Sequence, residues 1–108
     1  MFEVFQSENS EKYYFRLKAG NGETILQSQA YKDKASALKG VESVKKNGTS
    51  EENFEIREAA NGKGYFVLKA GNGQIIGQSQ QYKSESGLQN GIQSTMKNAA
   101  GEIKDLTA

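Results

Sequence analysis

The chain has 108 residues, of which 14 are basic and 13 acidic, and this length is typical of one compact domain. The formal net charge of +1 disfavours duplex DNA and anionic membrane surfaces as partners. The sequence has no Cys and no His, which excludes disulfides, thiolate metal sites and His-based catalytic triads, so we expect no cofactor and no metal.

The chain begins with a pattern typical of three strands. β-prone residues in rough alternation predict strands over residues 2–6, 13–18 and 23–27. Asn21-Gly22 lies between the second and third of these, and an Asn-Gly pair supplies the positive φ values of a tight hairpin turn. We therefore expect these two strands to pair antiparallel, with Phe15 and Leu17 on one face.

The period then changes to that of a helix. Leu38, Val41 and Val44 recur at spacings of three between polar residues, which predicts an amphipathic helix over residues 34–47. Asp33 is suited to the N-cap, and Gly48 is a stop signal at the C-terminal end.

Gly40 lies in the middle of this predicted helix, where Gly costs up to about 1 kcal/mol relative to Ala. Gly91 occupies the same position in the second half of the chain. The pair indicates either a close approach of each helix to a strand or to the other helix, or simple inheritance from a duplication. The sequence leaves both explanations open.

The second half of the chain repeats the first at an offset of 51 residues (65 − 14 and 78 − 27), because residues 14–22 return as 65–73 and 27–32 return as 78–83. The repeat predicts strands over residues 54–58, 65–69 and 74–78 and a helix over 85–98, capped by Ser84. The residues that follow look like the start of a third copy, which predicts a C-terminal edge strand within residues 102–107.

These elements predict an α+β fold in which two tandem β-β-β-α repeats, residues 2–49 and 53–100, form a single domain over residues 1–108 with pseudo-twofold symmetry. An antiparallel sheet should pack against two helices. Neither repeat is large enough to bury a robust core alone, so we expect a shared core. The predicted core residues are Val4, Phe15, Leu17, Ile25, Leu38, Val41, Val44, Ile56, Phe66, Leu68, Ile76, Leu88, Ile92 and Met96.

The repeated segments resemble the YegP-like family of small, mostly bacterial proteins. The resemblance rests on Phe-Arg-Leu-Lys-Ala at residues 15–19, Asn-Gly-Glu at 21–23, a Ser-x-x-Tyr at 28–31 and a helix with Gly-Val or Gly-Ile at 40–41 and 91–92. Residues 43–47 and 105–107 add to it. The resemblance implies tandem β-β-β-α units, and it implies that single-copy relatives dimerise to make the same object. The family is a domain of unknown function, so no catalytic residues carry over.

Two departures from the family pattern concern charge. Gln29 and Gln80 stand where the family often has Glu, and Val67 replaces the arginine that the first copy has at Arg16. A role that needs a carboxylate or a guanidinium at these places is therefore not expected. Such differences between the repeats, with Glu23 against Gln74 as another, mark where the two halves have diverged.

Two loops between a strand and a helix hold the candidate ligand residues. A loop that leads into a helix N-terminus can present backbone N–H groups to an anion, and Ser, Gln, Tyr and Lys can hydrogen-bond a phosphate, a carboxylate or a peptide backbone. The alternative is structural, with the tyrosines packed on the sheet and the serines fixing the turn. The candidates are Ser28, Gln29, Tyr31 and Lys32, and their counterparts Ser79, Gln80, Tyr82 and Lys83.

The composition favours a non-enzymatic binding or interaction module whose partner is a protein or peptide, and exposed sheet edges are able to accept a partner strand. The first alternative is a single-stranded nucleic-acid binder that uses Tyr14, Tyr65 and Arg16 with Lys18 and Lys69. The second alternative is an enzyme of unknown type. We expect a cytoplasmic protein, since no signal peptide or membrane-spanning run is apparent. We also expect a monomer, because the two repeats form a pseudo-dimer within one chain.

Overall fold

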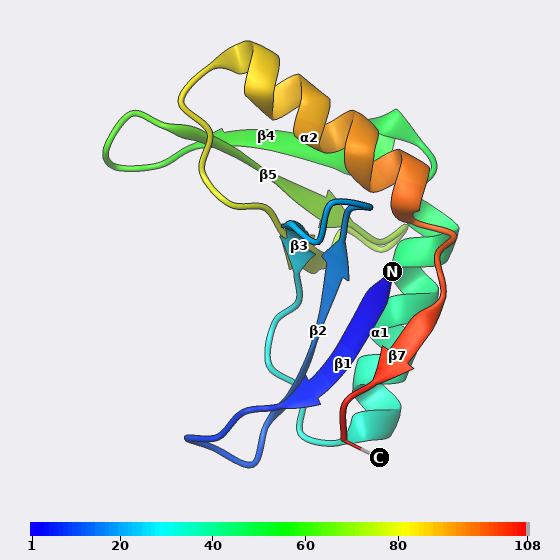
Figure 1. Cartoon of the computed structure of the whole chain (residues 1–108). Helices are drawn as coiled ribbons and strands as arrows, with labels where there is room; N and C mark the ends of the chain where they lie inside the picture. The colour runs from blue at the N-terminus through cyan, green and yellow to red at the C-terminus, as the bar shows by residue number, and fades with distance from the viewer. Residues whose placement is uncertain (108) are drawn as a thin grey trace.

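The computed structural model describes residues 1–107, which form one seven-stranded sheet and two α-helices (Figure 1). The sheet has the order β4-β5-β6-β3-β2-β1-β7, and every pair is antiparallel except the parallel pair β1–β7. In chain order the elements are β1 (Phe2–Gln6), β2 (Tyr13–Lys18), β3 (Thr24–Gln27), α1 (Lys34–Asn47), the 3₁₀ turn η1 (Glu51–Asn53), β4 (Phe54–Glu58), β5 (Gly64–Lys69), β6 (Ile75–Gln78), α2 (Glu85–Asn98) and β7 (Ile103–Asp105).

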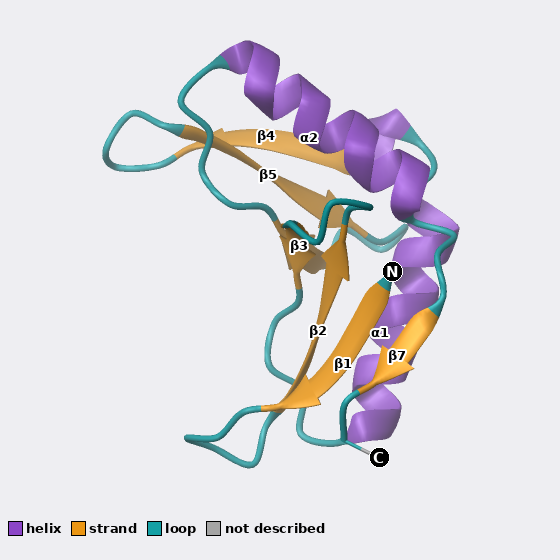
Figure 2. Ribbon diagram, viewed as in Figure 1, coloured by secondary structure: helices purple, strands orange, loops and turns teal. Residues whose placement is uncertain are grey.

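Two β-β-β-α repeats share this sheet, as the sequence predicted. They join where β3 pairs with β6 through Gln27 and Gln78, which occupy the same position in the two repeats. This pair therefore marks the pseudo-twofold axis. Helix α1 contacts β5 and β6 of the second repeat, and α2 contacts β2 and β3 of the first. The helices cover one face of the bent sheet and close a single core, while the other face stays uncovered (Figure 2).

The helices begin and end where the sequence predicted. Asp33 accepts a hydrogen bond from Ser36 N–H at 2.8 Å, and Ser84 accepts one from Gly87 N–H at 3.0 Å, so each N-cap satisfies an otherwise free donor. Gly48 ends α1 without a left-handed conformation. A Cβ there would lie 3.1 Å from Ala99 Cβ, so this glycine allows the ends of the two helices to approach each other.

The hairpin turns differ from the expectation in one respect. Gly22 and Gly73 have φ values of 85° and 86°, but no residue other than glycine among residues 1–107 has a positive φ, so Asn21 does not adopt the left-handed conformation. Instead Asn21 Oδ1 accepts a hydrogen bond from Glu23 N–H at 2.9 Å. This three-residue turn, residues 20–22, needs only one left-handed residue, and the register of the two strands shifts between Leu17 and Lys18, before the turn.

The core prediction was wrong at Ile56, which is 49% exposed. Its counterpart is Val4, at an offset of 52 residues because the turn after β4 is one residue shorter than the turn after β1. Val4 is fully buried, because β7 flanks β1 and α1 packs on it, whereas no strand within residues 1–107 flanks β4 and α2 packs less closely on it. Leu38 and Met96 are only partly buried and pack against the core. Phe2 and Leu26, which were not predicted, are fully buried within it.

Candidate functional site

The serines of the two candidate loops are structural tethers. Ser28 Oγ accepts a hydrogen bond from Phe15 N–H at 2.8 Å and donates one to Gln29 O at 2.8 Å. Ser79 makes the same pair of bonds with Phe66 N–H and Gln80 O. Both serines are 7% exposed. Each hydroxyl has a donor and an acceptor inside the protein, which fixes the loop against β2 or β5.

The tyrosines of the loops lie across the helices. Tyr31 stacks on Phe15 with ring centroids 6.2 Å apart, and a Cβ on Gly40 would lie 2.5 Å from the Tyr31 hydroxyl. Tyr82 has the same relation to its own helix, where a Cβ on Gly91 would lie 2.3 Å from its hydroxyl. The mid-helix glycines therefore permit a close approach, made by the loop tyrosine together with a strand residue: the same Cβ atoms would lie 2.6 Å from Phe15 of β2 and 3.1 Å from Phe66 of β5. Burial raises the pKa of both phenols, which keeps them protonated.

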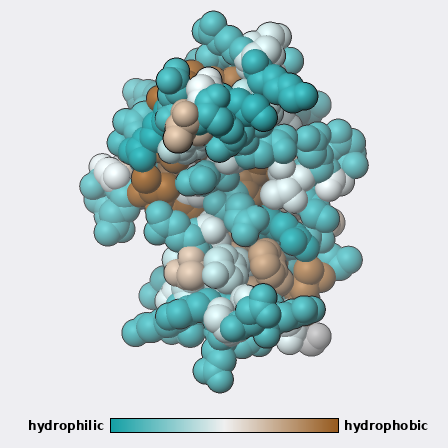
Figure 3. Space-filling model, turned by 90° about the vertical axis from the view of Figure 1, so that its left-hand side faces the viewer, coloured by the Kyte–Doolittle hydropathy of each residue, from teal (hydrophilic) through white to brown (hydrophobic). Residues whose placement is uncertain are grey.

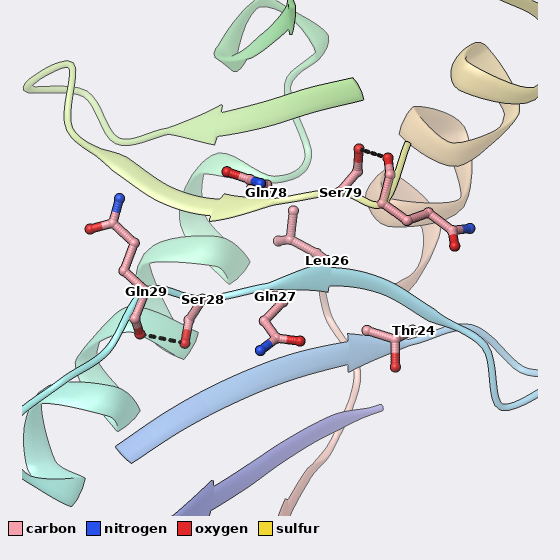
Figure 4. A pocket seen from close by; sticks show the side chains of 8 residues that line it. Thr24, Leu26, Gln27, Ser28, Gln29, Gln78 and Ser79 are labelled. Atoms are coloured by element: carbon pink, nitrogen blue, oxygen red, sulfur yellow. Dashed lines mark hydrogen bonds between the residues drawn. The ribbon is translucent and has the colours of Figure 1, made fainter. Parts of the chain in front are cut away.

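The two loops meet at the centre of the sheet. Ser28, Gln29, Ser79 and Gln80 line one shallow hollow of about 470 Å³ together with residues of β3 and β6. Figure 4 shows Gln27 and Thr24 on the side away from Leu26, which points toward β6. Tyr31 borders a different hollow of about 400 Å³, and Tyr82 another of about 200 Å³. The candidate residues are thus divided, and neither lysine of the loops lines these hollows.

The uncovered face of the sheet carries a Glu-Arg-Lys cluster in each repeat. In the first, Glu3 Oε1 lies 2.7 Å from Arg16 Nε and 3.4 Å from Lys18 Nζ. The Arg16 hydrogen bond lowers the pKa of the largely buried Glu3 carboxyl despite its desolvation, and it keeps the cluster ionised. Arg16 also lies 4.5 Å from the centroid of the Phe5 ring, on which Tyr14 stacks.

The second repeat builds its cluster differently. Glu55 pairs with Lys69 at 3.0 Å. The arginine that binds Glu55 is Arg57 of the same strand, because the position equivalent to Arg16 holds Val67. Hydrogen bonds from Arg57 and Lys69 lower the pKa of Glu55. The repeat therefore keeps a guanidinium at a different position, which the comparison of Arg16 with Val67 alone did not reveal.

These clusters bear on the alternative that the chain binds single-stranded nucleic acid. Lys18 and Lys69 both lie on the uncovered face, but each is ion-paired with a glutamate of its own repeat. The Tyr14 ring already stacks on Phe5. Seen from the left of Figure 1, the surface is mostly hydrophilic, and apolar residues appear only in small separate areas (Figure 3).

One edge of the sheet is covered by the tail of the chain. Phe2 N–H donates to Glu102 O at 2.7 Å, and Leu106 N–H donates to Val4 O at 2.8 Å, so β7 runs parallel to β1. Lys34, the first residue of α1, binds Asp105 of β7 at 2.8 Å. This lysine and the Thr107 hydroxyl hold the pKa of Asp105 well below its usual range.

The opposite edge, β4, has no neighbouring strand on its outer side within residues 1–107. The first backbone bond on this edge is nevertheless equivalent to that on β1, because Phe54 N–H donates to Glu51 O, and Glu51 is the counterpart of Glu102. After Glu102 the chain continues alongside β1, whereas after Glu51 it turns into β4 itself. A hollow of about 490 Å³ borders this edge, and Ile56 lines it.

Residues 1–107 hold no group of three or more acidic side chains placed to share a metal ion. Neither helix of this part of the chain combines the length and apolarity needed to cross a membrane.

Comparison with models of known protein families identifies the family of this chain. A family model described as a domain of unknown function, DUF1508, matches residues 8–55 and 59–105. The chain belongs to this family. The matched segments run from β2 into β4 and from β5 to the end of β7. The first match ends at Glu55, the second residue of β4, and the second match ends at Asp105, the last residue of β7.

Bacterial relatives confirm the YegP-like resemblance. The UPF0339 protein plu2779 of Photorhabdus laumondii is 52% identical over 99 residues, which cover 91% of this chain and 87% of the relative. The UPF0339 protein YegP of Escherichia coli K12 is 48% identical over 107 residues, covering 98% and 96%. The names of these DUF1508 relatives state no activity.

Solved structures confirm the fold. The solution NMR structures of the UPF0339 protein SO3888 from Shewanella oneidensis and of YegP from Escherichia coli each match with a TM-score of 0.90 at 47% identity. Each match covers 97% of this chain, and 89% and 90% of the two solved chains respectively. YegP is described there as a protein of unknown function.

Proposed function

We propose that this chain is a non-enzymatic protein-binding module that takes up an extended polypeptide segment at the open edge of β4. One observation carries the proposal: β1 binds a strand along its edge, and the equivalent strand β4 has no such neighbour within residues 1–107. An unpaired edge presents backbone N–H and C=O groups that a partner strand can bind, and neighbouring side-chain sites give selectivity.

The direction of the free groups on β4 follows from the pseudo-symmetry. Phe2 N–H and Val4 C=O point toward β7, so the equivalent backbone groups, Phe54 N–H and Ile56 C=O, point away from β5. Phe54 N–H is already bound by Glu51 O. The groups of Ile56 are thus placed at the middle of the available edge, beside an apolar side chain that a bound strand would cover.

The proposal includes the cytoplasmic, monomeric state expected from the sequence. An enzymatic role finds no support in the tyrosines, whose raised pKa values oppose use as a base at neutral pH. A nucleic-acid role finds little support in the cations of the uncovered face, which already pair with Glu3 and Glu55.

The test is a selection of displayed peptides on the native chain and on Ile56→Pro. Proline removes the outward N–H of Ile56 and is tolerated on an edge strand, because the bonds to β5 come from the neighbouring residues. We expect peptides that the native chain enriches and Ile56→Pro does not, with amide shifts along β4. Two results would contradict the proposal: peptides that bind both chains equally, and peptides that shift only the amide resonances of residues lining the hollow between β3 and β6.

A further inference from the structure

The two edges of the sheet differ in charge at equivalent positions. On the β1 side, Asp105 lies opposite Val4 and its carboxylate binds Lys34, the first residue of α1. The counterpart of Lys34 is Glu85, the first residue of α2. The site that binds an acidic side chain beside β1 is therefore acidic beside β4.

A second position changes in the same direction. Gln6 ends β1, and the residue that ends β4 in the same register is Glu58. Both glutamates of the β4 side are exposed, and neither forms an ion pair within residues 1–107. Figure 1 shows the N-terminal end of α2 over the hairpin end of β4, as the N-terminal end of α1 lies beside the end of β7.

Lys34 and Glu85 differ in how well each fits the dipole of its own helix. A lysine in the first helical turn opposes the helix dipole, so the bond to Asp105 is its evident role in α1. Glu85 suits the dipole of α2, but Glu58 belongs to a strand and is no part of that helix. The acidic character of the β4 edge thus has a component that helix stability does not explain.

We infer that the β4 edge selects an extended segment, parallel to β4, that carries Lys or Arg opposite Ile56. This inference rests on the proposed strand binding. The methylene stem of Lys or Arg covers the exposed Ile56 side chain, and its charged end reaches toward Glu58 and Glu85. The same charges reject the tail of a second copy, since Asp105 would meet Glu85 there. The chain therefore avoids joining to itself through β7 and β4.

Two peptides test the inference. One has the sequence of residues 101–107, Gly-Glu-Ile-Lys-Asp-Leu-Thr, and the other has Lys in place of Asp at the position of Asp105. Each is titrated to millimolar concentration into the ¹⁵N-labelled chain at low salt. We expect the Lys peptide to shift the amides of Ile56 and Glu58 and to bind at least about tenfold more tightly than the tail peptide, a factor that two charge contacts can supply.

Glu85→Lys should reverse this preference, and Glu85→Gln should remove most of it. A nitroxide on a cysteine added to either peptide end gives the orientation, because the chain has no cysteine of its own. A parallel strand puts its C-terminal label near Glu58. Equal binding of both peptides at β4 would overturn the charge selection and leave strand binding standing. Absence of any shift at β4 would overturn both, and concentration-dependent self-association through β4 would assign the edge to a second copy instead.

Discussion

Leu26 lies against Gly77 across the junction of the two repeats. These residues occupy the same position in the two copies, so the pseudo-twofold axis pairs a large residue with the smallest one. A Cβ on Gly77 would lie 2.8 Å from Leu26 Cγ, and Leu26 is fully buried. The central contact of the sheet is therefore asymmetric, and a chain with leucine at both positions would not close in the same way.

Gly77→Ala should destabilise the fold by about 1–3 kcal/mol, because the new methyl group overpacks the junction. Urea unfolding followed by circular dichroism measures the change. Leu26→Ala alone should cost about 2–5 kcal/mol through the cavity it leaves. In the double variant the new methyl group gains room, so its loss of unfolding free energy should be smaller than the sum of the losses in the two single variants. Strict additivity would show that the contact between residues 26 and 77 does not limit packing.

Gly40→Ala and Gly91→Ala should both be destabilising, although Ala in place of Gly normally favours a helix by up to about 1 kcal/mol. The reason is the tyrosine hydroxyl that lies within 2.5 Å of the position of each new methyl group. Thermal unfolding checks the sign. Lys39→Ala, an exposed change in the same helix, is the matched control and should stay within about 0.5 kcal/mol of the native chain.

Ser28→Ala and Ser79→Ala should each cost about 1–3 kcal/mol, since each leaves the buried N–H of Phe15 or Phe66 with a lost acceptor. Chemical denaturation gives the values. Ser86→Ala, at an exposed helical position, is the control. If the serines act only on a ligand, the free chain should lose no stability, and this result would contradict the structural role assigned to them.

The docking of β7 should depend on pH through Asp105. Its pKa is lowered in the folded chain, so the bond to Lys34 stabilises the docked tail above the ordinary aspartate pKa of about 3.9 and is lost as pH falls below that range. Hydrogen-exchange protection of the Phe2 and Leu106 amides reports this docking. Asp105→Asn should lower that protection near neutral pH and matter less in acid; an equal effect at both would contradict the role of the charge.

Most of the fold follows from local patterns that a single sequence carries. The helix period, the caps Asp33 and Ser84 and the glycine turns are decided within a few residues, and the helices have the predicted bounds. The error at Ile56 has a different origin. Its burial depends on segments from elsewhere in the chain, and within residues 1–107 β7 lies beside β1 while no strand lies beside β4. Alternation within β4 cannot reveal that.

The candidate site was harder to predict for a related reason. Ser28 accepts a hydrogen bond from Phe15 N–H of β2, and the Tyr31 hydroxyl packs against Gly40 of α1. Both partners come from other elements of the fold, so local sequence does not reveal them. The signal that could have found the β4 edge is the repeat itself. Aligning Glu85 with Lys34, and Glu58 with Gln6, displays one charge reversal and one added negative charge once β7 is known to lie beside β1.

Amide hydrogen exchange of Ile56 and Val4 in the free chain tests the central claim, that equivalent edges are covered on β1 and open on β4, most directly. The parallel ladder with β7 uses the outward groups of Val4, so this amide should exchange slowly, while that of Ile56 should exchange as an exposed edge amide does. Protection at Ile56 equal to that at Val4 in the monomer would contradict the account.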